Sequence, residues 1–454
     1  MRRNTEEMYA SEKPWKLFFI VALPGMISMF TMSIYSILEG AFIGHTLGES
    51  AFAAVNIAMP LVMINFSLGD LIGVGAAVPI SIALGKNNHD EANNAFSCSV
   101  VSIFITSIIM GFLMFCLAEP LAKMMGADGS LLETSVRYLR TFAIMSPLSV
   151  IFFAMDNYLK ISGFVKFSMC INILCNVLNI GLLTFFLLVR NMDVVGAALA
   201  TSISFCVCSL TAMMPFVFKK ALLKFKKPEF SFKLLKQIAA CGSPIFLSNI
   251  SGRVASIIMN IALMTIGTRE LGINGGTTAV AVYAVLMYSS DLCWPLLYGI
   301  SDSLAPSIGF NWGAKNYNRV KKIAVCNYTG TFIVGIISTS ILFFFPHIIA
   351  SLFADKGDIQ LLEISTHAIR LFCFAYLFRW IVVTSQSLFS AIEKPLFATF
   401  IAVATSFVFP VLLIVLLQNF GLDGIWFNFV GVNFLSAVLS VILLFLFFSK
   451  MKKE

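Results

Sequence analysis

The stretch WKLFFIVALPGMISMFTMSIYSIL at residues 15–38 contains one charged residue, Lys16, and runs directly into EGAFIGH at residues 39–45. About 20 consecutive apolar residues are enough for an α-helix to cross the hydrocarbon core of a bilayer. The stretch therefore predicts a transmembrane helix, with Glu39 at its end. An ionisable side chain at membrane depth costs roughly 2.5–3.5 kcal/mol at a helix centre, so we interpret Glu39 as a functional residue.

The composition of the chain is that of a membrane protein. Of 454 residues, 59% are hydrophobic and 12% are charged, and the mean hydropathy is +0.90. Such a chain has too few polar residues to surround a soluble core. The N-terminal segment MRRNTEEMYASEKPWK carries both signs of charge and has no small-residue cleavage site. We therefore expect the first apolar stretch to be retained as an anchor in the lipid bilayer.

Apolar runs of about 20 residues or more recur along the whole chain and predict an all-α integral membrane protein with twelve transmembrane helices. In order, these predicted spans are 15–38, 51–84, 95–118, 138–161, 164–189, 194–218, 237–268, 278–312, 323–352, 366–391, 395–419 and 424–449.

Lysine and arginine residues are concentrated at the two termini and in alternate loops between the spans. Because basic residues favour the cytoplasmic side, we predict a multi-pass protein of the plasma membrane with both termini in the cytoplasm. This bias explains the formal net charge of +8 without a nucleic-acid partner. The basic stretch KKALLKFKKPEFSFKLLK, residues 219–236, is predicted to be a cytoplasmic linker that lies on anionic headgroups.

The sequence contains no catalytic constellation. Its four histidines lie near loops without ligand spacing, and its ten cysteines are scattered along the spans without a metal-type pattern. There is no GxSxG motif, no phosphate-binding loop and no soluble region large enough to hydrolyse ATP. We therefore predict no enzyme, no cofactor and no metal site, and expect an ion gradient to supply the energy for any transport.

The basic linker divides the twelve spans six and six, and the two halves resemble each other. AAVPISIALGKNN at residues 76–88 recurs as SLAPSIGFNWGAKN at residues 303–316, and Pro79 and Pro306 are 227 residues apart. Because each half has an even number of spans, the repeat is parallel and predicts two six-helix lobes with a substrate cleft between them near the midplane. The predicted lobes are residues 1–225 and 226–454.

Several motifs occur in a characteristic order. IYSILEGAFIGH lies in the first span, LGDLIGVGAAVPISIALGKN in the second, VVGAALATSIS in the sixth and APSIGFNWGAKN after the eighth. Together they resemble the MATE family of multidrug and toxic-compound extrusion antiporters, nearest to its MepA-like bacterial branch, over essentially all twelve spans. The resemblance implies a V-shaped two-lobe fold, export of cationic or amphipathic organic compounds, and coupling to proton or sodium entry.

The resemblance assigns roles in the N-lobe. Glu39 stands where most members have an aspartate that couples ion entry to export, and Asn179 and Thr201 match polar residues that line the pocket. The acid that usually follows this asparagine by four residues is Leu183 here, so one coupling carboxylate is missing. The predicted coupling and ion-binding residues are Glu39, Asp70 and Asn179, and the predicted substrate-binding residues are Tyr35, Asn176, Thr201 and Asp302.

The C-lobe departs further from the family pattern. Sodium-type members carry acids in the seventh and tenth spans, at places that correspond here to Arg253 and Arg379. A guanidinium group neither deprotonates nor binds sodium, so we expect a proton rather than sodium as the driving ion. Asp291 and Asp302 in the eighth span are the expected counter-ions of the two arginines in a C-lobe charge network.

These residues also have structural interpretations. Glu39 can be an acid held in place by Ser36 or Tyr35, and Asp70 can cap or kink its glycine-rich span. The two arginines are either charge partners of the aspartates or ligands for an anionic substrate.

Two further polar groups are open to both interpretations. Asp156 precedes Lys160 by four residues, and we expect an ion pair between them rather than substrate contact. Asn172, Asn176 and Asn179 share one helical face, where they form either interhelical hydrogen bonds or a binding stripe.

The sequence as a whole predicts a monomeric secondary active antiporter that exports organic cations in exchange for protons by alternating access. Two other classes remain open at this point. A flippase for lipid-linked precursors in the same superfamily requires a more cationic central cavity, of which the two arginines are the only sign. A membrane-embedded transferase requires a base and a nucleophile at the interface, and no such pair is visible.

Overall fold

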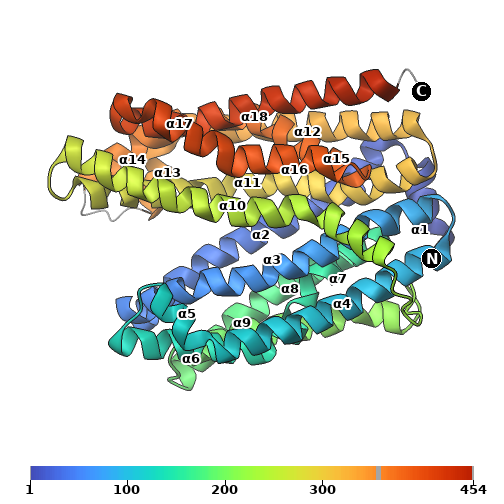
Figure 1. Ribbon diagram of the computed structural model, residues 1–454, viewed down its shortest axis with the longest axis horizontal. Coiled ribbons are helices and arrows are strands. Elements are labelled where there is room, and N and C mark those ends of the chain that lie inside the picture. Colours follow the sequence, from blue (N-terminus) through green and yellow to red (C-terminus); the bar gives the residue numbers. More distant parts are fainter. Residues whose placement is uncertain (1, 354–358, 452–454) are drawn as a thin grey trace. The chain divides into compact units, whose positions relative to one another are not determined.

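The computed structural model describes residues 2–353 and 359–451, which are almost entirely helical and contain no strand (Figure 1). Eleven helical stretches among them are long and apolar enough to cross a membrane. The last, Pro395–Ser449, contains two spans, because the chain turns at Gly421, where φ is +71°. Glycine adopts this left-handed conformation without steric cost. The predicted all-α class with twelve spans is confirmed.

The chain forms two compact units. The first unit consists of Met1–Phe246 and Pro306–Val320, and the second of Leu247–Ala305 and Lys321–Glu454. The units do not divide at the boundary predicted from the repeat, because the start of α10 (Phe232–Leu271) and the end of α11 (Gly275–Gly313) belong to the first unit. The division of the repeat at residue 225 stays a prediction.

In the first unit, α2 packs against α8, α8 against α9, and α6 against both α4 and α9. Phe66 lies at the centre of this packing and makes edge-to-face contacts with Phe142, Phe153 and Phe205, with ring centroids 5.0 to 5.7 Å apart. The helices of this unit are α1 (Arg2–Ser11), α2 (Pro14–Leu47), α3 (Glu49–Gly85), α4 (His89–Cys116), α5 (Ala118–Met124), α6 (Gly129–Ser149), α7 (Ile151–Ile161), α8 (Val165–Thr184), the π-helical turn η1 (Phe185–Val189) and α9 (Val194–Val217).

The N-terminal helix α1 is fastened to the first unit. Tyr9 is 2% exposed, and its hydroxyl donates to the carbonyl oxygen of Lys160 at 2.5 Å. Asn311 Nδ2 and Arg319 Nε donate to the carbonyl oxygen of Tyr9 at 2.9 and 2.8 Å. These contacts tie α1 both to the end of α7 and to the turn between α11 and α12 (Tyr317–Phe344).

The end of α3 and the end of α11 approach each other at two glycines. A Cβ atom at Gly85 would lie 1.9 Å from the carbonyl oxygen of Phe310, and one at Gly313 would lie 2.1 Å from that of Ile82. Only glycine permits so close an approach of two backbones. Phe310, the residue next to Gly85, lies three positions before Gly313, and Ile82, the residue next to Gly313, lies three positions before Gly85. The contact is therefore reciprocal, in agreement with the predicted repeat.

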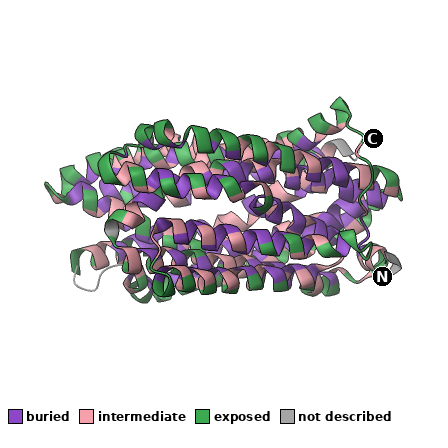
Figure 2. Ribbon diagram, turned by 90° about the horizontal axis from the view of Figure 1, so that it is seen from below, coloured by how far each residue is buried: buried purple, intermediate pink, exposed green. Residues whose placement is uncertain are grey.

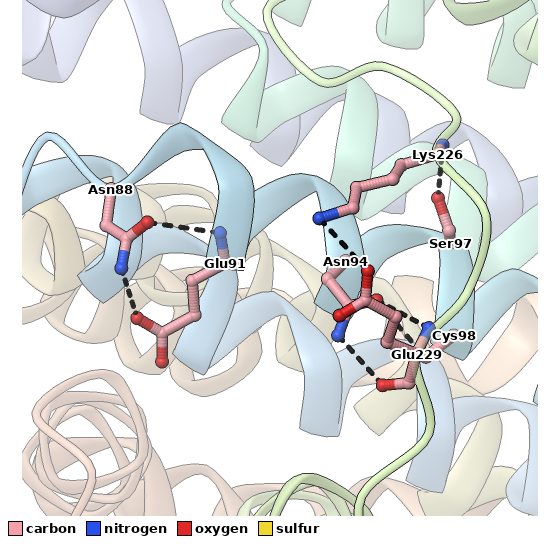
Figure 3. A network of polar contacts seen from close by, with 7 residues as sticks. All are labelled: Asn88, Glu91, Asn94, Ser97, Cys98, Lys226 and Glu229. Atoms are coloured by element: carbon pink, nitrogen blue, oxygen red, sulfur yellow. Dashed lines mark hydrogen bonds and ion pairs between the residues drawn. The ribbon is translucent and has the colours of Figure 1, made fainter.

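The basic linker is attached to the start of α4 (Figure 3). The backbone N–H groups of Lys226 and Glu229 donate to Ser97 Oγ and Asn94 Oδ1 at 2.9 and 2.8 Å, and Asn94 Nδ2 donates back to the carbonyl oxygen of Glu229 at 3.0 Å. Asn88 caps the helix by accepting from the backbone N–H of Glu91. Helix side chains therefore hold the backbone of the linker, while its contact with headgroups stays a prediction.

The second unit has one continuous apolar core. Trp426, which is 1% exposed, packs there with residues of α10, α11, α14 and the helices between them. The remaining elements are α13 (Pro346–Phe353), α14 (Ile359–Phe372), the 3₁₀ turn η2 (Cys373–Ala375), α15 (Tyr376–Ala391), α16 (Pro395–Val403), the π-helical turn η3 (Ala404–Val408), α17 (Phe409–Leu417), the 3₁₀ turn η4 (Gln418–Phe420) and α18 (Gly421–Met451).

Exposed residues recur along the helices (Figure 2), and large apolar residues are among them. Phe112 on α4, Ile257 on α10 and Phe400 on α16 are examples, each at least 60% exposed. In water such surfaces would associate. In a helix that spans a bilayer they face the hydrocarbon chains of the lipids.

Candidate functional site

Glu39 lies on α2 inside a buried polar cluster of the first unit, and is 8% exposed. Its Oε1 accepts a hydrogen bond from Thr201 Oγ1 of α9 at 2.7 Å, and its carboxylate also accepts one from the Tyr35 hydroxyl, one turn earlier on α2. Asn179 Nδ2 of α8 donates to the same Tyr35 hydroxyl. Four predicted residues on three helices thus form one hydrogen-bonded chain that ends on the carboxylate.

Two polar atoms beside this chain have no hydrogen-bond partner within the described residues. They are Asn179 Oδ1 and Asn176 Nδ2, both shielded from solvent on α8. Buried polar atoms normally find a partner, so each unpaired one calls for an explanation. In the described part of the chain, α8 therefore has one acceptor, Asn179 Oδ1, and one donor, Asn176 Nδ2, that are buried and unpaired.

The remaining member of the asparagine stripe has a structural role. Asn172 Nδ2 donates to Asp156 Oδ1 at 2.7 Å, and Ser168 donates to the same oxygen. The other carboxylate oxygen, Oδ2, lies 2.8 Å from Lys160 Nζ, and both side chains of this pair are almost fully buried. The predicted ion pair of Asp156 and Lys160 is confirmed, and Asn172 is part of its hydrogen bonding.

Arg379 lies in the second unit on α15, one turn after η2. Its Nη1 donates a long hydrogen bond of 3.4 Å to Asn433 Oδ1 on α18, and its Cζ lies 6.0 Å from the ring centroid of Trp294 on α11. Its Nε is shielded and has no partner in the described part of the chain. Trp294 in turn stacks on Tyr298, with ring centroids 4.9 Å apart.

The predicted pairing of the two arginines with Asp291 and Asp302 stays a prediction, because no such ion pair is seen among the described residues. Among residues 2–353 and 359–451, neither Arg253 nor Arg379 has a carboxylate oxygen within ion-pair distance. Arg253 and Asp291 are exposed, whereas Asp302 is half-buried.

Comparison with known proteins places this arrangement in a family. The MatE family model matches residues 24–184 and 244–416, which include both the Glu39 helix and the Arg379 helix. The chain belongs to the MATE family.

Curated and solved MATE proteins resemble the chain over nearly its whole length. The multidrug export protein MepA of Staphylococcus aureus is 25% identical over 448 residues, 97% of this chain and 96% of the relative. A crystal structure of MATE in the straight conformation has a TM-score of 0.92 at 22% identity and covers 99% of both chains. The outward-facing conformation of a multidrug resistance MATE family transporter has a TM-score of 0.89 at 22% identity and covers 98% of both chains.

Within this MATE fold, the other predicted site residues lie as follows. Asp70 is half-buried on α3 of the first unit, and Asp302 lies on α11 of the second. The coupling role of Asp70 and the substrate role of Asp302 stay predictions.

The sequence analysis did not identify Tyr138 or Trp294. Tyr138 on α6 is 2% exposed and lies within electrostatic range of Glu39. Trp294 follows Asp291 by three residues and supplies the aromatic face beside Arg379. Neither position carries a sequence signal, since an aromatic residue in an apolar span is most often a packing residue.

Proposed function

We propose that the protein is a secondary active antiporter of the plasma membrane that exports organic cations in exchange for protons. The observation that carries this proposal is the buried Glu39 carboxylate, which accepts hydrogen bonds from Tyr35 and Thr201 at one end of a transmembrane helix. A carboxylate is the one group in this cluster that changes charge by taking up a proton. The staphylococcal relatives are named multidrug export proteins, which supports the same assignment.

In this mechanism the proton and the substrate compete for binding at Glu39 in the first unit. A cationic substrate binds while Glu39 is ionised, and protonation of Glu39 removes the negative charge that holds the substrate. Coupling is reciprocal, because a proton that weakens substrate binding is itself bound less tightly when substrate is present. Asn179 Oδ1, which has no hydrogen-bond partner among the described residues, is a neutral acceptor that could receive a hydrogen bond from an ammonium group of the substrate.

The test is ethidium transport by the purified full-length protein in proteoliposomes with an imposed pH gradient. We expect ethidium to accumulate against its concentration gradient on the side with the higher proton concentration, and accumulation to stop when an uncoupler collapses the gradient. Failure to move ethidium or any other organic cation under this gradient would contradict the proposal.

A further inference from the structure

Arg379 is a cation without an anionic partner near the middle of a span. It belongs to the candidate span Ile359–Ala391 and is only partly exposed. A guanidinium group has five N–H donors. Within the described residues, these donors make only the 3.4 Å hydrogen bond to Asn433, whose own Nδ2 donates to the carbonyl oxygen of Phe429. Most of the donors of Arg379 are therefore available to another molecule.

An unpaired charge at this depth is unfavourable for folding. Desolvation of a buried cation is costly, and an ion pair or a set of hydrogen bonds normally offsets it. The cation–π contact with Trp294 at 6.0 Å offsets only part of that cost. The Lys160–Asp156 pair in the first unit is a contrast, because its two charges meet at 2.8 Å and Ser168 and Asn172 also donate to the Asp156 carboxylate.

The groups around Arg379 are suited to a planar aromatic acid. A guanidinium fork binds a carboxylate through two parallel hydrogen bonds. Trp294 adds an aromatic face, already stacked on Tyr298 with an interplanar angle of 16°, and an indole N–H that has no partner in the described part of the chain. A positive charge, a second donor and aromatic faces thus lie together on α11 and α15.

We propose that Arg379 and Trp294 form a carboxylate-binding subsite in the second unit, and that the ligand it takes is an aromatic compound with a free carboxylate group. The inference rests on the proposed export function, since it adds a recognised group to the substrate. This subsite differs from the cation site assigned to Glu39 in two ways. It lies in the second unit, and the group that it binds is negatively charged.

A matched pair of fluorescent probes tests this subsite. A rhodamine with a free carboxylate and the ethyl ester of the same dye share a cationic ring system and differ only in the anionic group. Fluorescence anisotropy with purified full-length protein measures the binding of each. We expect wild type to bind the free acid about ten-fold more tightly than the ester, as for a hydrogen bond to a charged group, and Arg379→Gln to bind both equally.

Two controls accompany the binding measurement. Arg190→Gln removes an arginine that lies over Phe185 at 5.9 Å in the first unit, and it should keep the wild-type preference. Arg379→Lys retains the charge without the planar fork and should keep only part of the preference.

The outcomes separate this subsite from the export function. Equal binding of acid and ester by wild type, or an unchanged preference in Arg379→Gln, would overturn the subsite even if ethidium is exported normally. Loss of ethidium export by wild type would contradict the proposed function, while the binding preference would still report on Arg379. If Arg379→Gln fails to insert, Arg379→Lys and Trp294→Leu replace it, and a full preference in both would overturn the proposal.

Discussion

The Glu39 cluster of the first unit and the Arg379 cluster of the second differ in the sign of their charge. They also differ in how many hydrogen bonds the charged group makes with the rest of the protein. Glu39 accepts hydrogen bonds from Tyr35 and Thr201, and Asn179 supports Tyr35. Arg379 has one long hydrogen bond and one aromatic face. A carboxylate whose hydrogen bonds come from the protein is prepared to hold charge without a ligand. A guanidinium that lacks an anion is not, so the proposed carboxylate-binding subsite differs from the Glu39 cluster in the charge of the group that it would bind.

The largest effect should come from the acid. Glu39→Gln replaces the carboxylate with an amide of nearly the same size, so the protein should insert normally but lose proton-coupled ethidium export completely. Glu119→Gln is the matched control, because Glu119 is exposed and pairs with Lys123 at 2.8 Å. Glu39→Asp should keep partial activity, since it retains an ionisable group. If Glu39→Gln accumulates ethidium against its gradient as well as wild type does, Glu39 has no role in coupling.

The Asp156–Lys160 ion pair is the reference for the stability effect of a buried charge that has a partner. Lys160→Met leaves the Asp156 carboxylate buried without its cation, which should lower the free energy of unfolding by roughly 3–5 kcal/mol. The double variant Lys160→Met, Asp156→Leu should recover most of that loss. Thermal unfolding of the purified proteins in detergent measures both. Strictly additive effects of the two single substitutions would show that the pair is not coupled.

A smaller effect should follow from the loss of one donor to Glu39. Thr201→Val keeps the shape of the side chain but removes the hydrogen bond to Oε1, which should reduce the rate of proton-driven export by about ten-fold. Thr184→Val is the control, because the hydroxyl of Thr184 bonds only within α8, to the carbonyl oxygen of Ile180 at 2.8 Å. An equal reduction in both variants would mean that the hydroxyl at position 201 has no specific role.

The stability of Arg379 variants should change least. Because Arg379 has no carboxylate partner among the described residues, Arg379→Gln removes a charge without stranding another, and the free energy of unfolding should stay within about 1 kcal/mol of wild type. The same thermal unfolding assay as for Lys160→Met compares the two sites directly. A loss as large as that of Lys160→Met would indicate an ion pair at Arg379 after all.

Replacement of sodium should have no effect on transport. With arginines at the two positions where sodium-type members have acids, we expect a pH gradient alone to drive ethidium export at the same rate in sodium-free and sodium-containing buffers. Export that requires sodium and continues without a pH gradient would contradict the assignment of the proton as the driving ion.

The sequence predicted the spans and much of the Glu39 cluster, but not the arginine environment. Tyr35, Glu39, Asn179 and Thr201 were all expected near a site, and the structure brings them together. This succeeded because an ionisable or amide side chain in an apolar span is conspicuous. The expected pairs of Arg253 and Arg379 with the eighth-span aspartates stay predictions, because residues at equal depth need not face each other and the sequence does not give their direction.

The N-terminal segment gives a second contrast. The segment carries both signs of charge, and nothing in MRRNTEEMYASEKPWK points to Tyr9. In the structure, Tyr9 is buried and joins α1 to α7 and to the turn after α11. A tyrosine in a charged segment is ordinarily a surface residue, so only the folded chain reveals this role.

By itself the sequence determined that this chain is a twelve-span membrane protein with an acid in its first span, because hydrophobic length and the cost of buried charge are local properties. The tertiary structure alone decided which polar atoms meet. It placed Asn172 on Asp156 and Thr201 on Glu39, and it left Arg379 against Trp294 with no anion among the described residues. Such contacts depend on the rotation and crossing of helices far apart in sequence, which local periodicity does not specify.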